Sequence, residues 1–169
     1  LTTHPAGYSS YERWFRHDGK DSLGEYWLDK ANQMAKDFVL KGKKVLELGC
    51  AKGFLVEDLR SLGVDAYGID ISSYALGEAS EKVRPYLAEG DIRSILQSYQ
   101  DNEFDFVYGK DILDCLTDDE GKQVLIEVAR IGKNYKFWEP EIGNLNYYNI
   151  KSISEWGSLL NNQIVQKWP

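Results

Sequence analysis

The chain has 169 residues, and its 43% hydrophobic and 13% aromatic content is enough for one globular domain with a single core. Its 27 acidic residues outnumber its 20 basic ones, and the formal net charge of −7 disfavours partners such as nucleic acids or anionic membranes. Two cysteines far apart in the sequence, the lack of a leader pattern and the lack of an apolar run near ~18 residues lead us to expect a reduced, cytoplasmic protein.

The N-terminal segment, residues 1–40, differs in character from the rest. Its first part is polar but contains Tyr8, Tyr11 and Trp14, which are too many rings for a simple solvated tail. These rings either cover one edge of a sheet or form a lid that excludes water from a bound cofactor, and the sequence leaves both open. Residues 23–40 then carry apolar side chains every three or four positions, which predicts an amphipathic helix.

Residues 41–169 alternate between strand and helix patterns, and we expect them to form the core of a single domain spanning 1–169. Strands are predicted at 43–49, 64–71, 85–92, 104–112, 134–140 and 163–168, and helices at 54–63, 73–83, 92–100, 118–131 and 153–162. This rhythm predicts an α/β fold: a doubly wound, Rossmann-like and mostly parallel sheet with helices on both faces. Ligands of such folds bind outside the carboxyl ends of the strands.

A loop of small residues, Gly49, Ala51 and Gly53, follows the first strand of this core. Such a loop is either a tight turn without a ligand or a place where backbone approaches a cofactor. Asp70 comes at about the 20-residue spacing at which an acid meets ribose hydroxyls, although alone it would be a helix cap. The glycine spacing departs from the dinucleotide fingerprint, and Glu47 would repel a diphosphate but attract an ammonium group. Together these residues favour a cofactor that joins adenosine to an amino acid.

Four segments carry a family resemblance: VLELGCAKG (45–53), AYGID (66–70), AEGDI (88–92) and FDFVYGKDILDCL (104–116). In this order they resemble the motifs of class I S-adenosylmethionine-dependent methyltransferases over about residues 40–140. The resemblance implies that the 47–53 loop faces the methionine part, that Asp70 binds the ribose, and that Asp91 contacts the adenine amino group. The cofactor-binding residues implied are Glu47, Gly49, Cys50, Ala51, Gly53, Asp70, Ile71, Asp91, Ile92, Gly109 and Lys110.

The sequence also departs from parts of this family's pattern. Many small-molecule members have Glu-x-x-Glu-His after the fourth strand, but this chain has Asp111 and Asp114 there and no histidine. The resemblance places Asp111 toward the acceptor, and either aspartate could act as a base for a hydroxyl. The Asn/Asp-Pro-Pro-Tyr segment typical of nucleic-acid base methylation is absent, and no metal site is expected. We also expect the antiparallel C-terminal hairpin of the fold to be incomplete.

The sequence therefore predicts a methyltransferase that uses S-adenosyl-L-methionine and acts on oxygen or nitrogen of a small-molecule or sugar acceptor. The sugar option rests on residues 139–160, which loosely resemble methyltransferases that accompany sugar-modifying enzymes and otherwise read as an ordinary loop and helix. One alternative is a non-catalytic S-adenosylmethionine-binding module that acts through a partner. Another is an NAD-type oxidoreductase, which the glycine spacing and Glu47 disfavour. No nucleic-acid or membrane partner is expected.

Overall fold

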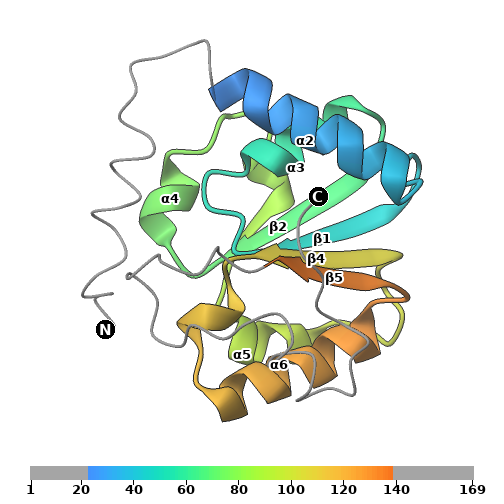
Figure 1. Ribbon diagram of the computed structural model, residues 1–169. Helices are drawn as coiled ribbons and strands as arrows, with labels where there is room; N and C mark the ends of the chain where they lie inside the picture. The colour runs from blue at the N-terminus through green and yellow to red at the C-terminus, as the bar shows by residue number, and fades with distance from the viewer. Residues whose placement is uncertain (1–22, 139–169) are drawn as a thin grey trace.

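The computed structural model describes residues 23–138, which form a five-stranded parallel sheet covered by helices on both faces (Figure 1). The strands are β1 (Lys44–Leu48), β2 (Asp65–Asp70), β3 (Leu87–Glu89), β4 (Phe106–Lys110) and β5 (Tyr135–Trp138). Their order is β3-β2-β1-β4-β5, so the chain reverses its direction of winding between β1 and β4. This arrangement confirms the doubly wound fold and makes the carboxyl ends of β1 and β4 the expected ligand position.

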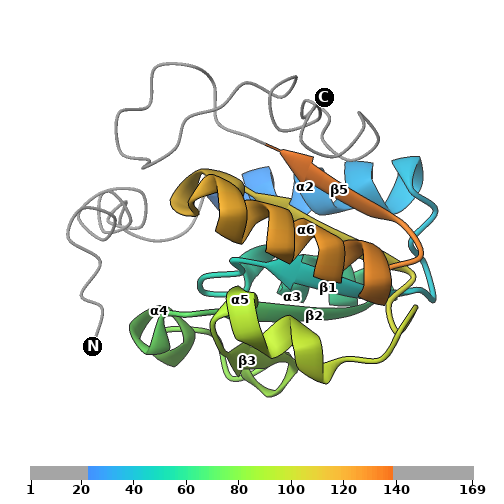
Figure 2. The ribbon, with the colours of Figure 1, turned by 90° about the horizontal axis from the view of Figure 1, so that it is seen from below.

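Two helical layers enclose the sheet. Helices α2 (Leu23–Asp37) and α3 (Phe54–Ser61) cover one face, and α5 (Ile92–Ile95) and α6 (Asp118–Ile131) cover the other (Figure 2). The short helix α4 (Ser73–Gly77) follows β2. Three short 3₁₀ helices complete the described elements: η1 (Arg84–Tyr86), η2 (Leu96–Ser98) and η3 (Leu113–Cys115).

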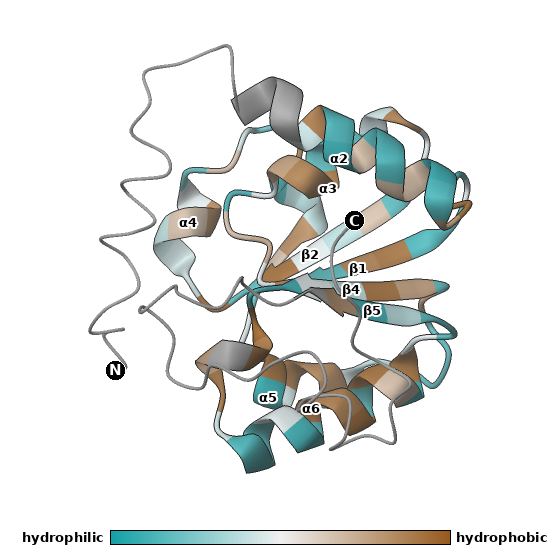
Figure 3. Ribbon diagram, in the orientation of Figure 1, coloured by the Kyte–Doolittle hydropathy of each residue, from teal (hydrophilic) through white to brown (hydrophobic). Residues whose placement is uncertain are grey.

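The core consists of two apolar layers because side chains alternate between the faces of each strand. Val45 and Phe106 pack with the helices α2 and α3, whereas Leu46, Leu48 and Val107 pack with α6. Figure 3 shows hydrophobic stretches along β1 and β4 in the middle of the sheet. Burying a leucine completely contributes about 2 kcal/mol, so both faces of the central strands hold the sheet between its helices.

Helix α2 ends at Asp37, three residues earlier than the hydrophobic pattern predicts. Val39 adopts a left-handed conformation with φ 53°, and the Leu40 N–H donates to the Ala35 carbonyl at 2.9 Å. This turn leaves Val39 exposed and brings Leu40 into the core. Burial of Leu40 therefore ends the helix before the lysines that follow.

The helix predicted at 73–83 is also shorter, because α4 ends at Gly77. Its start agrees with the sequence, since the Ser72 hydroxyl accepts a hydrogen bond from the Ala75 N–H. Beyond Gly77, the Arg84 guanidinium donates to the carbonyl oxygens of Gly77 and Ala79, at 3.2 and 2.8 Å. These carbonyls therefore have side-chain donors where a longer helix would supply backbone donors.

The remaining boundaries differ by a few residues. The predicted helix 92–100 is divided into α5 and η2, and β3 is only three residues long. The capping box predicted at Thr117 and Glu120 is present at the start of α6. None of the helices in residues 23–138 has the length and apolar character that crossing a membrane requires. The helix and strand predicted at 153–162 and 163–168, and with them the C-terminal hairpin, lie outside the described residues.

Candidate functional site

The loop between β1 and α3 adopts an unusual backbone that the small residues permit. Gly49, Ala51 and Gly53 all have left-handed conformations, with φ 77°, 51° and 72°. The N–H groups of Gly49 and Cys50 both donate to the Ile69 carbonyl, at 2.8 and 3.0 Å, so the loop turns tightly against the end of β2. A side chain would add strain at these conformations, which explains the glycines and marks Ala51 as a strained position.

Asp70, the last residue of β2, connects two loops at the carboxyl edge. Its Oδ2 accepts from the Ala51 N–H and its Oδ1 from the Ser72 N–H, both at 2.8 Å. Capping of α4 belongs to Ser72, so the helix-cap interpretation of Asp70 is wrong. The carboxylate therefore holds the 49–53 loop against the segment that leads into α4.

Glu47 is the one buried charged side chain among the described residues, with 7% of its surface exposed. It lies on β1 between two register partners, Gly68 on β2 and Tyr108 on β4. Burial raises the pKa of Glu47 to about 8, hydrogen bonding with Tyr108 offsets part of the rise, and Asp70 adds to it. Within the described part of the chain, Glu47 Oε2 has no hydrogen-bond partner. A buried acceptor without a donor is costly, so this atom fits a ligand that supplies a donor.

Cys50 packs into the space that Gly68 leaves free. A Cβ at Gly68 would lie 2.6 Å from Cys50 Cβ and 2.7 Å from its Sγ. Burial raises the pKa of the Cys50 thiol, and the charges of Glu47 and Asp70 raise it further, so the thiol stays neutral. Cys50 is therefore a packing residue whose backbone, not its thiol, belongs to the loop.

The end of β4 carries the next group of expected residues. Gly109 is tightly packed, because a Cβ there would lie 2.7 Å from Ile112 and 2.9 Å from Phe137. Lys110 forms an ion pair with Oδ2 of Asp111, which has a left-handed backbone with φ 54°. Asp111 Oδ1 is buried and has no hydrogen-bond partner among the described residues. Asp114 lies in η3, and its side chain is outside the described part of the chain.

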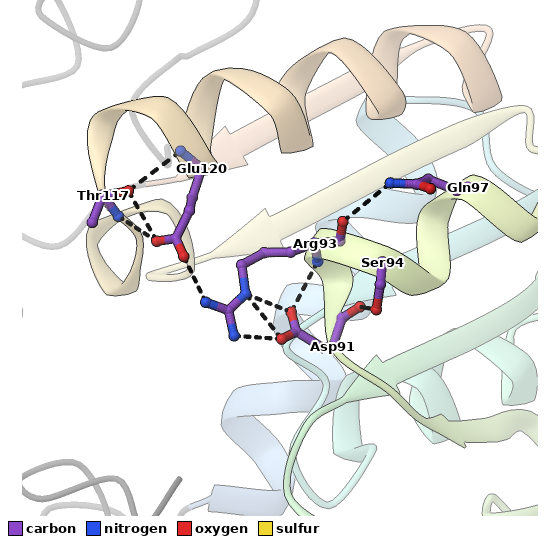
Figure 4. A network of polar contacts seen from close by, with 6 residues as sticks. All are labelled: Asp91, Arg93, Ser94, Gln97, Thr117 and Glu120. Carbon is purple, nitrogen blue, oxygen red and sulfur yellow. Dashed lines mark hydrogen bonds and ion pairs between the residues drawn. The ribbon is translucent and has the colours of Figure 1, made fainter.

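Asp91 caps α5 at the outer end of the same edge. Its Oδ1 accepts from the Arg93 backbone N–H at 2.9 Å, and Arg93 Nε lies 2.9 Å from both carboxylate oxygens (Figure 4). Hydrogen bonding from the Arg93 side chain lowers the pKa of Asp91. Of the two neighbouring isoleucines, Ile92 is buried and Ile71 is 43% exposed.

The structure thus brings most expected residues to one edge of the sheet and adds two that the sequence pattern did not single out. Tyr108 could have been found from the register of β1 and β4 but not from the sequence alone. Arg93 could have been found from its spacing of two residues from Asp91. Tyr8, Tyr11 and Trp14 lie outside the described residues. In the described range there is no group of three or more His, Cys, Asp or Glu residues placed to hold a metal ion.

Comparison with known proteins agrees with this geometry. The model of the family described as methionine biosynthesis protein MetW matches residues 30–155. A ubiquinone biosynthesis O-methyltransferase of Methylococcus capsulatus is 33% identical over 119 residues, which cover 65% of this chain and 48% of that protein. This chain therefore aligns with about half the length of that curated relative.

Two solved structures are similar in fold to this chain. Magnesium protoporphyrin IX methyltransferase from Synechocystis PCC 6803, with bound SAM, superposes with a TM-score of 0.67 at 20% identity, covering 91% of this chain and 80% of that one. A SAM-dependent methyltransferase from Aquifex aeolicus has a TM-score of 0.62 at 23% identity, covering 84% and 82%. The family match extends over most of the chain. The chain therefore belongs to the MetW family and has the fold of class I S-adenosylmethionine-dependent methyltransferases.

Proposed function

We propose that this chain is an S-adenosylmethionine-dependent methyltransferase domain that transfers a methyl group to an oxygen of a small-molecule acceptor. The observation that carries the proposal is the buried Oε2 of Glu47, which has no donor among the described residues and lies at the switch point of the sheet. The curated relative is named an O-methyltransferase of ubiquinone biosynthesis, which supports a small-molecule hydroxyl as the acceptor. Nitrogen and sugar acceptors remain part of the same proposal, with less support from the relatives' names.

The residues present fit the cofactor's three chemical parts. Glu47 would accept a hydrogen bond from the ammonium group, because a buried carboxylate is stabilised by a cation at close range. Asp70 would accept from the ribose hydroxyls with the same carboxylate that holds the N–H groups of Ala51 and Ser72. Asp91 would accept from the adenine amino group, and Ile71 and Ile92 would flank its ring. The backbone of 49–53, with Gly109 and Lys110, would lie along the methionine side.

When bound, the cofactor supplies a methyl group activated by a sulfonium centre. The protein's task is to hold the acceptor in line with that group and to exclude water. Asp111 would take the proton of an acceptor hydroxyl at Oδ1, because Oδ2 is occupied by Lys110. Asp114 is a second candidate for this base. The aromatic residues Tyr8, Tyr11 and Trp14 would close the site as a lid.

A nicotinamide cofactor fits these residues less well. The buried Glu47 carboxylate is a poor neighbour for a diphosphate, and the spacing of Gly49, Ala51 and Gly53 departs from the dinucleotide fingerprint. A non-catalytic module that binds S-adenosylmethionine and acts through a partner would have the same cofactor contacts. It differs from the enzyme only in that no acceptor becomes methylated.

Calorimetric titration with S-adenosylmethionine tests the first half of the proposal. We expect the wild-type protein to bind and Asp70→Ala to bind at least ten-fold more weakly, since a charge-assisted hydrogen bond contributes about 1.5–3 kcal/mol. Asp70→Ala also frees two backbone N–H groups, so its thermal unfolding must be measured in parallel. Glu81→Gln is the matched control, because Glu81 is exposed and is not among the expected cofactor-binding residues.

A methyl-transfer assay tests the second half of the proposal, that an acceptor becomes methylated. Incubating the protein with cofactor labelled in its methyl group and a fractionated cell extract should label a small molecule. Tight binding without any labelled product would favour the non-catalytic module. No heat and no thermal stabilisation with the cofactor would contradict the whole proposal.

A further inference from the structure

A chain of polar contacts runs from the adenine side of the candidate site to the start of α6 (Figure 4). It consists of four residues, which we call the Arg93 bridge: Asp91, Arg93, Glu120 and Thr117. Arg93 binds the Asp91 carboxylate through Nε and Nη2, and its Nη1 donates to Glu120 Oε1 at 2.6 Å. Glu120 Oε2 in turn accepts from the Thr117 N–H and hydroxyl, at 2.9 and 3.0 Å. The bridge therefore joins the first residues of two helices that follow different strands.

Arg93 gives Asp91 three N–H donors through four contacts. Asp91 receives the Arg93 backbone N–H, the Nε–H shared by its two oxygens, and one N–H of Nη2. Each carboxylate oxygen therefore has two contacts with Arg93. Because the guanidinium is a rigid planar group, it also fixes the plane of that carboxylate. Asp91 is thus oriented before any ligand arrives.

The other end of the bridge reaches the acceptor side. Thr117 is the N-cap of α6 and ends the segment 111–116, which begins with Asp111 at the end of β4. Hydrogen bonding by Thr117, and then by Arg93, lowers the pKa of Glu120, so Glu120 stays ionised and holds both partners. A change in the position of Arg93 is therefore transmitted to the helix start that supports this segment.

We propose that Arg93 is a positioning residue that couples occupation of the adenine side of the cofactor site to the start of α6, through Asp91 and Glu120. This inference rests on the proposed function, because it takes Asp91 as the acceptor for the adenine amino group. Arg93 itself touches neither reactant in this scheme. Its effect is to hold Asp91 in one orientation, and Glu120 holds Arg93.

Ordinary stabilisation does not account for the arrangement. The side chains of Arg93, Asp91 and Glu120 are 43%, 30% and 34% exposed, and ion pairs at such sites contribute little to stability. A comparable arginine, Arg130, joins the other end of α6 to η2 through the carbonyls of Leu96 and Tyr99 and through Asp101. Because Arg130 lies in the last turn of α6, at the opposite end from Thr117, its contact with Asp101 gives a control for purely structural effects.

The test measures binding of S-adenosylhomocysteine by calorimetry to wild type, Glu120→Gln and Asp101→Asn. In Glu120→Gln, an amide replaces the carboxylate that binds both Thr117 and Arg93. If the amide oxygen accepts from Thr117, an NH₂ group faces Arg93. If the oxygen faces Arg93 instead, it is a neutral acceptor and binds the guanidinium more weakly than a carboxylate does. We expect Glu120→Gln to weaken binding about five-fold or more, a coupling of ordinary allosteric size, and Asp101→Asn to leave it unchanged. In an Arg93→Met background, which itself binds weakly, adding Glu120→Gln should have no further effect.

Thermal unfolding of every variant separates loss of folding from loss of coupling, and Arg93→Met gives the same test if Glu120→Gln does not fold. Unchanged binding by a folded Glu120→Gln or Arg93→Met would overturn the inference while leaving the proposed function intact. An equal loss in Asp101→Asn, or additive losses in the double variant, would also overturn it. Failure of the wild-type protein to bind S-adenosylhomocysteine would contradict the proposed function, and this inference with it.

Discussion

Glu47 and Tyr108 are direct register partners on the two central strands, and both side chains are buried on the face covered by α2 and α3. Gly68 is the register partner of Glu47 on its other side and has no side chain with which to solvate it. The sheet therefore holds an ionisable group in an apolar layer with little compensation. Such an arrangement lowers the stability of the empty protein and leaves a strong binding position for a cation.

Glu47→Gln should therefore stabilise the protein without ligand. The folded protein holds the Glu47 proton up to a pKa of about 8, whereas the unfolded chain releases it near the ordinary glutamate pKa of 4.5. Wild-type stability is thus lost relative to Glu47→Gln as the pH rises from about 4.5 to about 8. The difference in the free energy of unfolding should reach on the order of 4 kcal/mol near pH 8.

Urea unfolding of both proteins between pH 5 and pH 8 measures this difference. The matched control is Glu81→Gln, which removes a carboxylate from an exposed position and should behave like the wild type. If the difference in the free energy of unfolding between Glu47→Gln and wild type does not grow with pH, Glu47 is ionised in the folded protein.

Binding of S-adenosylmethionine should release a proton from Glu47 at pH 6–7. The empty site keeps Glu47 protonated below its pKa of about 8, and an ammonium group beside it favours the ionised form. The observed heat of binding at pH 6–7 should then differ between two buffers of different ionisation enthalpy. In Glu47→Gln the residual binding should be insensitive to the buffer. Equal heats in both buffers for the wild type would count against an ammonium group at this position.

The sequence predicted the doubly wound parallel sheet and the carboxyl edge well because both follow from local patterns. Alternating strands and helices imply parallel pairing, and the small residues 49–53 are needed for the left-handed turns observed there. Helix ends were predicted less well. Burial of Leu40 ended α2, and the Arg84 contacts with Gly77 and Ala79 replaced a longer α4. These are tertiary interactions between residues whose proximity no local pattern reveals.

The candidate site shows the same division. Asp70 and Glu47 stand beside a glycine loop and could be picked from spacing, but their environment could not. That Glu47 is buried opposite Tyr108 depends on which strands are neighbours. That Asp91 has a guanidinium on both oxygens depends on a side-chain conformation. Sequence patterns thus identified the acidic residues. Their protonation states and their hydrogen-bond partners became visible only in the folded structure.

Gly68→Ala should destabilise the protein and disturb the cofactor loop. The new Cβ would lie 2.6 Å from Cys50 Cβ, a distance that real contacts do not reach, so the loop must move away from β2. Overpacking of this kind typically costs about 1–3 kcal/mol, and S-adenosylmethionine binding should weaken as well. Chemical unfolding and calorimetry measure the two effects.

A second substitution distinguishes steric conflict from a loss of backbone freedom. Cys50→Gly removes the atoms that the new methyl group would meet, so Gly68→Ala/Cys50→Gly should regain part of the lost affinity. Gly77→Ala is a suitable control, because a Cβ at Gly77 has open space around it. If the double variant binds no better than Gly68→Ala, contact with Cys50 is not the cause.

Asp111→Asn should lower the rate of methyl transfer to a hydroxyl acceptor by about 100-fold or more, while cofactor affinity changes little. Asp111 Oδ1 is buried without a partner in the described range, and Lys110 holds the other oxygen, so one oxygen remains to accept a proton. The neutral amide cannot take that proton. Single-turnover rates with labelled cofactor, and the product's dissociation constant, measure the two quantities separately.

Asp114→Asn is the companion variant, because either aspartate after β4 is a candidate base. A large loss of rate in Asp111→Asn alone assigns the proton transfer to Asp111, and the reverse pattern assigns it to Asp114. Lys110→Met provides a further check, since it removes the ion pair with Asp111 Oδ2 while retaining the carboxylate. If Asp111 is the base, Lys110→Met should keep most of the rate that Asp111→Asn loses, because the carboxylate that takes the proton is still present. Unchanged rates in both aspartate variants would mean that the acceptor reacts without a base from this segment.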